Sequence, residues 1–283
     1  ARVCGVLAPS AKVRDVPGGI KVDGLWAYAS GVAHATWATV GAPRSGGAEG
    51  TSLLLIPVSD LSVELTWDPT GMRGTASNTL RGTDVFVPNH RILSFFAADG
   101  AIAGHIANDH SDEALYRTPL AGFASACIVG PLIGMAKAAL SHTLNHVVDR
   151  PVAYTYAKDQ SALVSTQLAV AEAATKIDSA ELHIHRAARD LDHAATTSTE
   201  LSLLVRARVR HDVGCGTHLL REAMTICQQI NGSSDMARGR SFERVWRDFS
   251  TSSNHAVLNL TTTAEVYGKI LCGHDPSELS GLY

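Results

Sequence analysis

The chain of 283 residues contains little cysteine, and its cysteines form no recognisable framework. The five cysteines are an odd number, are widely and irregularly spaced, and include no Cys-x-x-Cys pair. This usage argues against a disulfide scaffold or a cysteine-rich zinc site, and it indicates reduced thiols in a cytoplasmic protein. A membrane-spanning hydrophobic run is also missing, so no membrane partner is expected. The nearest stretch, 123–140, is rich in Ala and Gly and predicts a buried helix.

Charge of either sign is scarce. Charged residues make up 18% of the chain and the net charge is −3, which argues against nucleic acid or an anionic membrane as a partner. Aromatic residues amount to 6%, which does not discriminate between substrate classes. The length and the hydrophobic content of 45% suit a globular protein of one large or two ordinary domains.

Several familiar catalytic motifs are absent as well. The chain has no glycine-rich phosphate loop of the GxGxxG or P-loop kind, no GxSxG elbow and no HExxH pair. A helix through four of the possible metal ligands would present them on one face. These residues are His211, Cys215, His218 and Glu222. Because they match no metal-binding signature, we predict that the protein holds no metal.

Residues 1–97 have the pattern of a β domain. Short runs rich in Val, Leu, Ile and Thr alternate with Gly, Pro, Asn and Asp, as strands alternate with turns. The predicted strands are Val3–Leu7, Ile20–Asp23, Trp37–Val40, Ser52–Val58, Leu61–Thr66 and Thr83–Val87. We expect a small antiparallel barrel or sandwich, followed by a linker over 98–117.

Residues 118–283 have the pattern of a helical bundle. Large apolar residues recur every seven positions at Leu163, Val170, Ile177, Ile184 and Leu191. An alanine stands three residues after each of the last four, so this helix carries a seam that lets a neighbour approach closely. The predicted helices cover about 118–148, 160–195, 200–230 and 253–271. The predicted fold class is therefore α+β, a small β domain followed by a four-helix bundle.

The stretch from Phe242 to Asn259 is the most informative motif. It contains an Arg-x-aromatic-Arg-Asp sequence made of Arg244, Trp246, Arg247 and Asp248. This sequence resembles a signature of the acyl-CoA dehydrogenase superfamily, in which a catalytic glutamate follows shortly afterwards. Here residues 252–256 read Ser-Ser-Asn-His-Ala, with an imidazole at His255 and no carboxylate. The resemblance is therefore to the branch that hydroxylates substrates with reduced flavin and oxygen, the two-component flavin-dependent monooxygenases.

His255 is expected near the start of the final helix. The resemblance implies that it lies near the oxygen-reactive side of the flavin and serves as a catalytic base. An imidazole suits general-base work on a phenol or an amine near neutral pH. Outside that context, a packed or surface histidine would be the simpler interpretation.

A second motif, residues 24–37, resembles the stretch where the β domain of this family meets the flavin ring. It has the form Trp-x-aromatic-Ala-Ser-Gly, with Trp26, Ala29 and Ser30 as candidate flavin contacts. The implied catalytic role of Ser30 is a hydrogen bond to flavin N5. A small hydroxyl residue before Gly31 can approach a planar ring closely. A surface turn between strands, with packed tryptophans, is the alternative.

Other candidate flavin contacts come from three places in the chain. In a third motif, residues 67–78, Ser77 closes and Asn78 follows a Gly-Met-Arg-x-Thr-x-Ser sequence that resembles a family marker, and both could line the flavin or substrate cleft. Gly232 and Ser233 form a small-residue turn that in relatives approaches the flavin's phosphate-bearing tail. A plain helix C-cap is the alternative for that turn. Arg150 stands where relatives carry an arginine that pairs with flavin phosphate, although the Pro151 that follows departs from the usual pattern. An exposed arginine with no specific role is the alternative.

The resemblance covers nearly the whole chain, and the family's N-terminal helical domain is expected to be absent. It implies the oxygenase component of a two-component monooxygenase, supplied with reduced FMN or FAD by a separate flavin reductase. Flavin and O₂ would form a C4a-hydroperoxide that Ser30 protects, while His255 deprotonates a small aromatic or amine substrate. A homotetramer or homodimer is also implied.

Three alternatives stay open at this point. The first is an acyl-CoA dehydrogenase-type flavoprotein, for which Glu265 stands in the wrong register to be the usual base. The second is a non-catalytic flavin-binding or assembly subunit. The third is a helical-bundle interaction module, which leaves the motifs at Trp26–Ser30 and Trp246–His255 unexplained.

Overall fold

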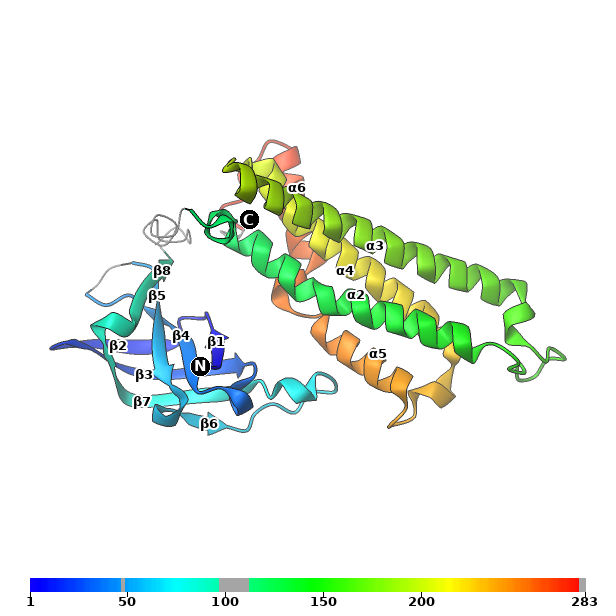
Figure 1. Cartoon of the computed structure of the whole chain (residues 1–283), viewed down its shortest axis with the longest axis horizontal. Helices are drawn as coiled ribbons and strands as arrows, with labels where there is room; N and C mark the ends of the chain where they lie inside the picture. The colour runs from blue at the N-terminus through cyan, green and yellow to red at the C-terminus, as the bar shows by residue number, and fades with distance from the viewer. Residues whose placement is uncertain (47–48, 97–111, 280–283) are drawn as a thin grey trace. The chain divides into compact units, whose positions relative to one another are not determined.

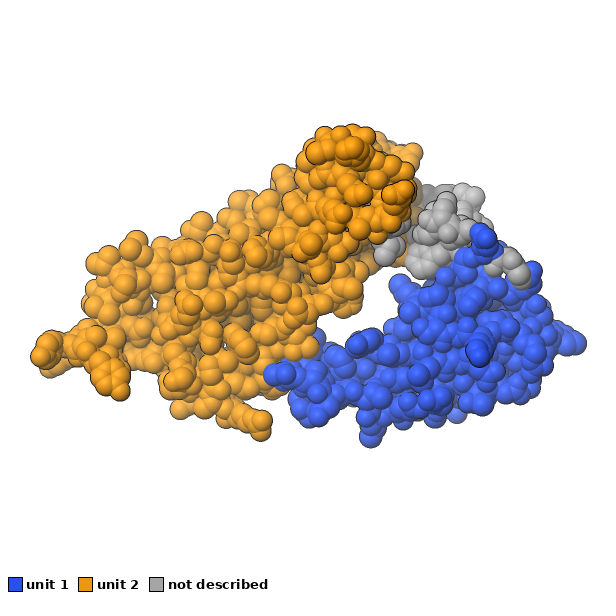
Figure 2. Space-filling model, turned by 180° about the vertical axis from the view of Figure 1, so that it is seen from behind, with its two compact units in different colours: residues 1–111 blue, residues 112–283 orange. Residues whose placement is uncertain are grey.

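The computed structural model describes residues 1–46, 49–96 and 112–279. The chain forms two compact units, Ala1–Ser111 and Asp112–Tyr283, which Figure 2 shows in separate colours. The first unit is built of strands and the second of helices (Figure 1), as the α+β prediction requires. Most of the predicted linker, 98–117, lies outside the described residues. Its last four residues, Ala114–Arg117, form a 3₁₀ turn in the helical unit.

The β unit contains two four-stranded sheets. One has the strand order β1-β4-β5-β8 and the other β2-β3-β7-β6. The strands are β1 Val3–Val6, β2 Ala11–Val16, β3 Gly19–Ala29, β4 Trp37–Pro43, β5 Thr51–Pro57, β6 Ser62–Glu64, β7 Asn78–Pro88 and β8 Ile92–Phe96. All described pairings are antiparallel except that of β1 with β4, which is parallel and departs from the prediction.

Each of the six predicted strands coincides with or falls within an observed strand, give or take a few residues, and β2 and β8 were missed. In β2, Ala-Lys-Val-Arg-Asp-Val, half of the residues are charged, because the strand presents one face to solvent. Strand β8 follows the 3₁₀ turn Asn89–Arg91 directly, so no Gly- or Pro-rich break announces it. Both strands lie at a sheet edge.

The core of the β unit surrounds the indole of Trp26, which has no exposed surface. The Trp26 indole Nε1 donates to the carbonyl oxygen of Gly41 at 2.7 Å. Val22 and Leu80 are fully buried from strands β3 and β7 of one sheet, and Val40 and Leu54 from β4 and β5 of the other. The packing of the two sheets thus holds the end of β3, and the turn that follows it, in a fixed place.

The helical unit has five helices among its described residues, one more than predicted. They are α2 Leu120–His146, α3 Val164–Thr197, α4 Leu203–Asn231, α5 Ser241–Ser252 and α6 Leu260–Leu271. The heptad seam of α3 is confirmed, because Ala173, Ile177, Ala180 and Ile184 are all buried. A Cβ added at Gly216 of α4 would lie 2.9 Å from the side chain of Ile184. The small residues therefore set the close approach of α3 and α4.

The prediction of one last helix over 253–271 was wrong. Helix α5 ends at Ser252, and α6 begins only at Leu260. Local hydrogen bonds separate them: the Asn254 Nδ2 donates to the Ser250 carbonyl oxygen at 2.6 Å, and the Asn259 Oδ1 accepts from the Thr262 amide at 3.2 Å. Side chains of this kind compete with the helical backbone for its hydrogen bonds. His255 consequently lies in a connection between helices and not on a helix.

Helix α2 was predicted to be a buried helix, and it is buried on one face only. Val129, Leu132, Ala136 and Ala139 belong to the core of the bundle. On the other side of the helix Phe123, Cys127, Gly130, Pro131 and Gly134 are exposed. By length and composition α2 is the one described helix that could cross a membrane, which is weak evidence for a span.

Candidate functional site

Ser30 lies in a tight turn directly after β3, and its side chain is exposed. The turn depends on left-handed backbone at Tyr28, with φ 65°, and at Gly31, with φ 80°. The Ser30 amide donates to the Tyr28 carbonyl oxygen at 2.8 Å, and the Gly31 amide donates to the Thr75 carbonyl oxygen at 2.7 Å. The hydrogen bond from Gly31 to Thr75 therefore joins the predicted motif at 24–37 to the predicted motif at 67–78.

A chain of hydroxyl groups runs back from Ser30 into the unit. The Ser30 and Ser77 hydroxyl oxygens are 2.8 Å apart, and those of Ser77 and Thr75 are 2.7 Å apart. The chain ends where the Thr75 hydroxyl donates to the Met72 carbonyl oxygen at 2.9 Å. Trp67 Nε1 donates to the same carbonyl oxygen at 3.0 Å. Two of the predicted site residues, Ser30 and Ser77, are thus in direct contact.

The structure places the side chains of three other predicted contacts of this group inside the unit. Those of Trp26 and Ala29 are fully buried and lie beneath the turn. Asn78 is 9% exposed, and its Oδ1 accepts from the Trp67 amide at 3.0 Å. Its side-chain oxygen therefore positions the segment that begins at Trp67. Sequence reasoning did not assign a role to Thr75, although it lies inside the quoted motif.

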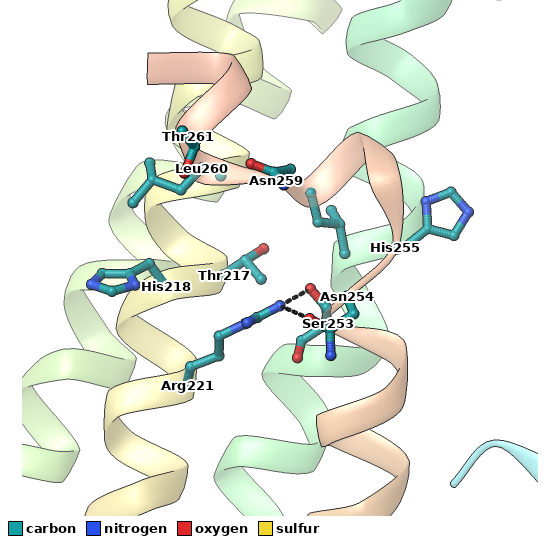
Figure 3. A pocket seen from close by; sticks show the side chains of 11 residues that line it. Thr217, His218, Arg221, Ser253, Asn254, His255, Asn259, Leu260 and Thr261 are labelled. Carbon is teal, nitrogen blue, oxygen red and sulfur yellow. Dashed lines mark hydrogen bonds between the residues drawn. The ribbon is translucent and has the colours of Figure 1, made fainter. Parts of the chain in front are cut away.

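In the helical unit, His255 borders a pocket of about 280 Å³ between α4 and the connection from α5 to α6. The pocket is lined by polar side chains, among them Thr217, His218, Arg221, Asn254 and Asn259 (Figure 3). Among the described residues, no carboxylate lines it. A pocket of this composition can orient a small polar ligand, but it offers no carboxylate base of the kind a dehydrogenase needs.

Arg221 of α4 ties down the segment that carries His255. Its Nη2 donates to the Ser253 carbonyl oxygen and, at 3.0 Å, to the Asn254 Oδ1 (Figure 3). Burial lowers the pKa of the guanidinium, which reports the cost of desolvating this cation inside the pocket. The pairing joins residues 32 positions apart, so no sequence pattern could have indicated it.

The imidazole of His255 is exposed and points away from Arg221 and Thr217 in Figure 3. Its Nδ1 accepts from the Val257 amide at 3.4 Å. This bond favours the neutral tautomer that carries its proton on Nε2. Because 3.4 Å is long for a hydrogen bond, the tautomer with a free lone pair on Nε2 is also accessible.

Arg150 and the turn at Gly232 lie together. The Arg150 Nη2 donates to the Asn231 carbonyl oxygen at 2.9 Å, and a Cβ added at Gly232 would lie 3.7 Å from the same nitrogen. Gly232 has φ 74° and ends α4, and the exposed Ser233 begins the next 3₁₀ turn. Arg150 thus satisfies carbonyl groups at the C-terminus of α4 and is not a free surface residue.

The prediction of no metal stays a prediction. Two of the four possible metal ligands considered in the sequence make other contacts. His211 stacks on Tyr267, and Cys215 contacts His183 at 3.9 Å. Among the described residues, His142, His146 and Asp235 have ligand atoms within 4.8 Å of one another.

In that group His142 and Asp235 form a hydrogen bond of 2.7 Å, which joins α2 to the turn after α4. The pKa of His146 is lowered, first by burial and further by the nearby charges of Arg150 and Arg240, although Asp235 opposes the shift. These cations also disfavour a metal ion, and we assign none here.

Comparison with known proteins establishes the class of the fold. The family described as acyl-CoA dehydrogenase, C-terminal domain, matches residues 126–260, from α2 to the first residue of α6. The solved structure of XiaF from Streptomyces sp., in complex with FADH2 and glycerol, is 31% identical with a TM-score of 0.89. The match covers 98% of this chain and 70% of XiaF. The fold is thus that of the acyl-CoA dehydrogenase superfamily.

Sequence relatives define the branch. The oxygenase component of the FADH(2)-dependent resorcinol hydroxylase of Rhizobium sp. (strain MTP-10005) is 30% identical, over 98% of this chain and 70% of that protein. The oxygenase subunit HsaA of Rhodococcus jostii (strain RHA1), a flavin-dependent monooxygenase, is 29% identical over 94% of this chain and 70% of its own length. This chain belongs to the same family, the oxygenase components of two-component flavin-dependent monooxygenases, as the resemblance predicted.

Proposed function

We propose that this oxidoreductase binds reduced FMN or FAD, delivered by a separate flavin reductase, and uses O₂ to hydroxylate a small aromatic or amine substrate. Bound reduced flavin would supply the two electrons that let one oxygen atom enter the substrate and the other leave as water. The relatives named for resorcinol hydroxylation and for flavin-dependent monooxygenation support this assignment. The dehydrogenase alternative is disfavoured, because no carboxylate lines the His255 pocket.

The residues present fit a flavin. The exposed Ser30 hydroxyl, backed by the buried Ser77, offers a hydrogen-bonding group to N5 of the ring. The amide of Ser233 and the guanidinium of Arg150 are suited to the phosphate of the flavin tail, because Gly232 leaves the backbone open to a close approach. No role is proposed for Trp26, Ala29 or Asn78 beyond supporting these groups.

His255 is proposed as the catalytic base that takes the proton from the substrate hydroxyl or amine. Its exposed ring can accept a proton at Nε2 once the weak bond from the Val257 amide is released. The exposed imidazole turns away from Arg221 and Thr217, so the substrate is proposed to meet His255 at its exposed face and not inside the pocket of about 280 Å³ that those residues line. A phenol carries a hydroxyl proton that an imidazole base can take.

The observation that carries the proposal is the exposed Ser30 hydroxyl held by the buried Ser77 and the half-buried Thr75. We expect Ser30→Ala to raise the hydrogen peroxide released per reduced flavin consumed about tenfold, because N5 loses its hydrogen-bond partner and oxygen chemistry becomes uncoupled from hydroxylation. Peroxide and hydroxylated product are measured in the same reaction. The matched control is Ser59→Ala, an exposed serine in a different turn of the same unit. Unchanged coupling in Ser30→Ala would remove Ser30 from the site.

We also propose a homodimer or homotetramer, with α2 at the interface between copies. This is supported by the apolar face of α2, whose exposed residues Phe123, Gly130, Pro131 and Gly134 allow close packing of a second copy. Light scattering of the full chain should give a dimer or tetramer mass, and Gly134→Glu should lower that mass. A wild-type monomer at micromolar concentration would contradict the proposal.

The cytoplasmic location is proposed from the five free cysteines.

A further inference from the structure

The hydroxyl chain behind Ser30 has only one possible direction. Met72 offers a carbonyl oxygen, which can only accept, and it receives the Thr75 hydroxyl at 2.9 Å and Trp67 Nε1 at 3.0 Å. The single hydrogen of the Thr75 hydroxyl is therefore committed to Met72. Thr75 can meet its second hydroxyl neighbour only as an acceptor.

The same count of hydrogens decides which hydroxyl group donates in the other two contacts. The contact of 2.7 Å between Ser77 and Thr75 needs a hydrogen, which only Ser77 can supply. The contact of 2.8 Å between Ser30 and Ser77 then takes the hydrogen of Ser30. Three contacts use three hydrogens, and any reversal would bring two oxygen lone pairs together. Because Ser77 is only 5% exposed, water is poorly placed to repair such a mismatch.

We propose that this chain makes Ser30 an obligate acceptor, so that Thr75 and Ser77 select reduced over oxidised flavin. Reduced flavin carries a hydrogen on N5 and can donate it to Ser30. Oxidised flavin has only a lone pair on N5, which would face the lone pairs of Ser30 unmatched. A site built for one hydrogen-bonding pattern rejects a ligand that presents the opposite one.

The inference rests on the proposed placement of Ser30 at flavin N5. Given that placement, the polarity of the chain matches a protein that receives its flavin reduced and must release it oxidised. Neither Thr75 nor Ser77 needs to touch the flavin. They are specificity residues that act through Ser30, and the carbonyl of Met72, held by a left-handed backbone at φ 57°, is the fixed end of the chain.

The test measures binding of both flavin forms to the full chain, with reduced flavin titrated under anaerobic conditions. In Thr75→Val the Ser77 hydrogen is released from Thr75 and can turn to Ser30, which frees the Ser30 hydrogen for N5 of oxidised flavin. We expect the ratio of dissociation constants, oxidised over reduced, to fall about tenfold, mainly through tighter binding of oxidised flavin. Ser77→Ala, a second way to break the chain, should shift the ratio in the same direction.

Two controls separate the effect of the hydrogen-bond direction in the hydroxyl chain from a general disturbance of the β unit. Thr75→Ser keeps the hydroxyl and should keep the wild-type ratio. Thr66→Val removes a hydroxyl that pairs with Thr79 at 2.8 Å elsewhere in the unit, and it should also leave the ratio unchanged. A wild-type ratio in both Thr75→Val and Ser77→Ala would overturn the inference while leaving the proposed function in place. If wild-type protein binds neither flavin form, the proposed function fails as well.

Discussion

Replacing His255 by alanine is expected to lower substrate hydroxylation about 100-fold while reduced-flavin binding stays within twofold of wild type. Loss of a positioned general base costs a factor of roughly 10²–10⁴ in the rate of a proton-transfer step. Flavin binding is spared because the imidazole is an exposed group at the rim of its pocket and contributes only a 3.4 Å contact to the local backbone. Hydroxylated product and flavin affinity are measured on the same preparation.

The matched control is His185→Ala, an exposed imidazole on α3 that lies outside the pocket. It should leave hydroxylation unchanged. If His255→Ala hydroxylates at the wild-type rate, the assigned role is wrong.

Replacing Arg221 by alanine is expected to lower hydroxylation about tenfold and to destabilise the helical unit by about 1–3 kcal/mol. The variant leaves the buried Ser253 carbonyl oxygen and the Asn254 amide oxygen without their donor. The connection that presents His255 then loses its tie to α4, and a misplaced catalytic group costs rate even when it is still present. Urea unfolding measures the stability loss, and product formation measures the rate.

A conservative variant and a surface control sharpen this test. Arg221→Lys keeps the charge but lacks the planar group that reaches two acceptors, so an intermediate effect is expected. Arg189→Ala, an exposed arginine on α3, should change neither quantity. A stability loss without any loss of rate in Arg221→Ala would show that the tie is structural only.

The sequence indicated the class of each unit because periodic burial is a local property. In α3 the seven-residue spacing survives into the structure, with Ala173, Ile177 and Ala180 all buried. The failure at 253–271 has the opposite cause. There Asn254 and Asn259 bind backbone groups, so residues 253–259 form a connection, and the helix before it, α5, lies outside the predicted segment at Ser241–Ser252. Hydrophobic periodicity alone does not detect such a break.

The candidate site was only partly predictable, for the same kind of reason. Ser30 and Ser77 were identified through motifs, and the structure brings them into contact across 47 residues of chain. Trp26 was assigned to the flavin because it stands in the same motif, and the motif did not indicate that its indole is buried, with Nε1 donating to the Gly41 carbonyl oxygen. Arg221 has no motif at all, because its partners are backbone and amide oxygens 32 and 33 positions away.

The most direct test of the central claim is rapid mixing of the full-length, flavin-reduced protein with oxygenated buffer. Absorbance is followed between about 370 and 400 nm, where oxygen adducts of flavin absorb, and in the band of oxidised flavin. We predict a transient in the first range that persists for seconds before oxidised flavin appears, and that decays faster in Ser30→Ala. Direct return to oxidised flavin, with no transient, would contradict the assignment as a monooxygenase component.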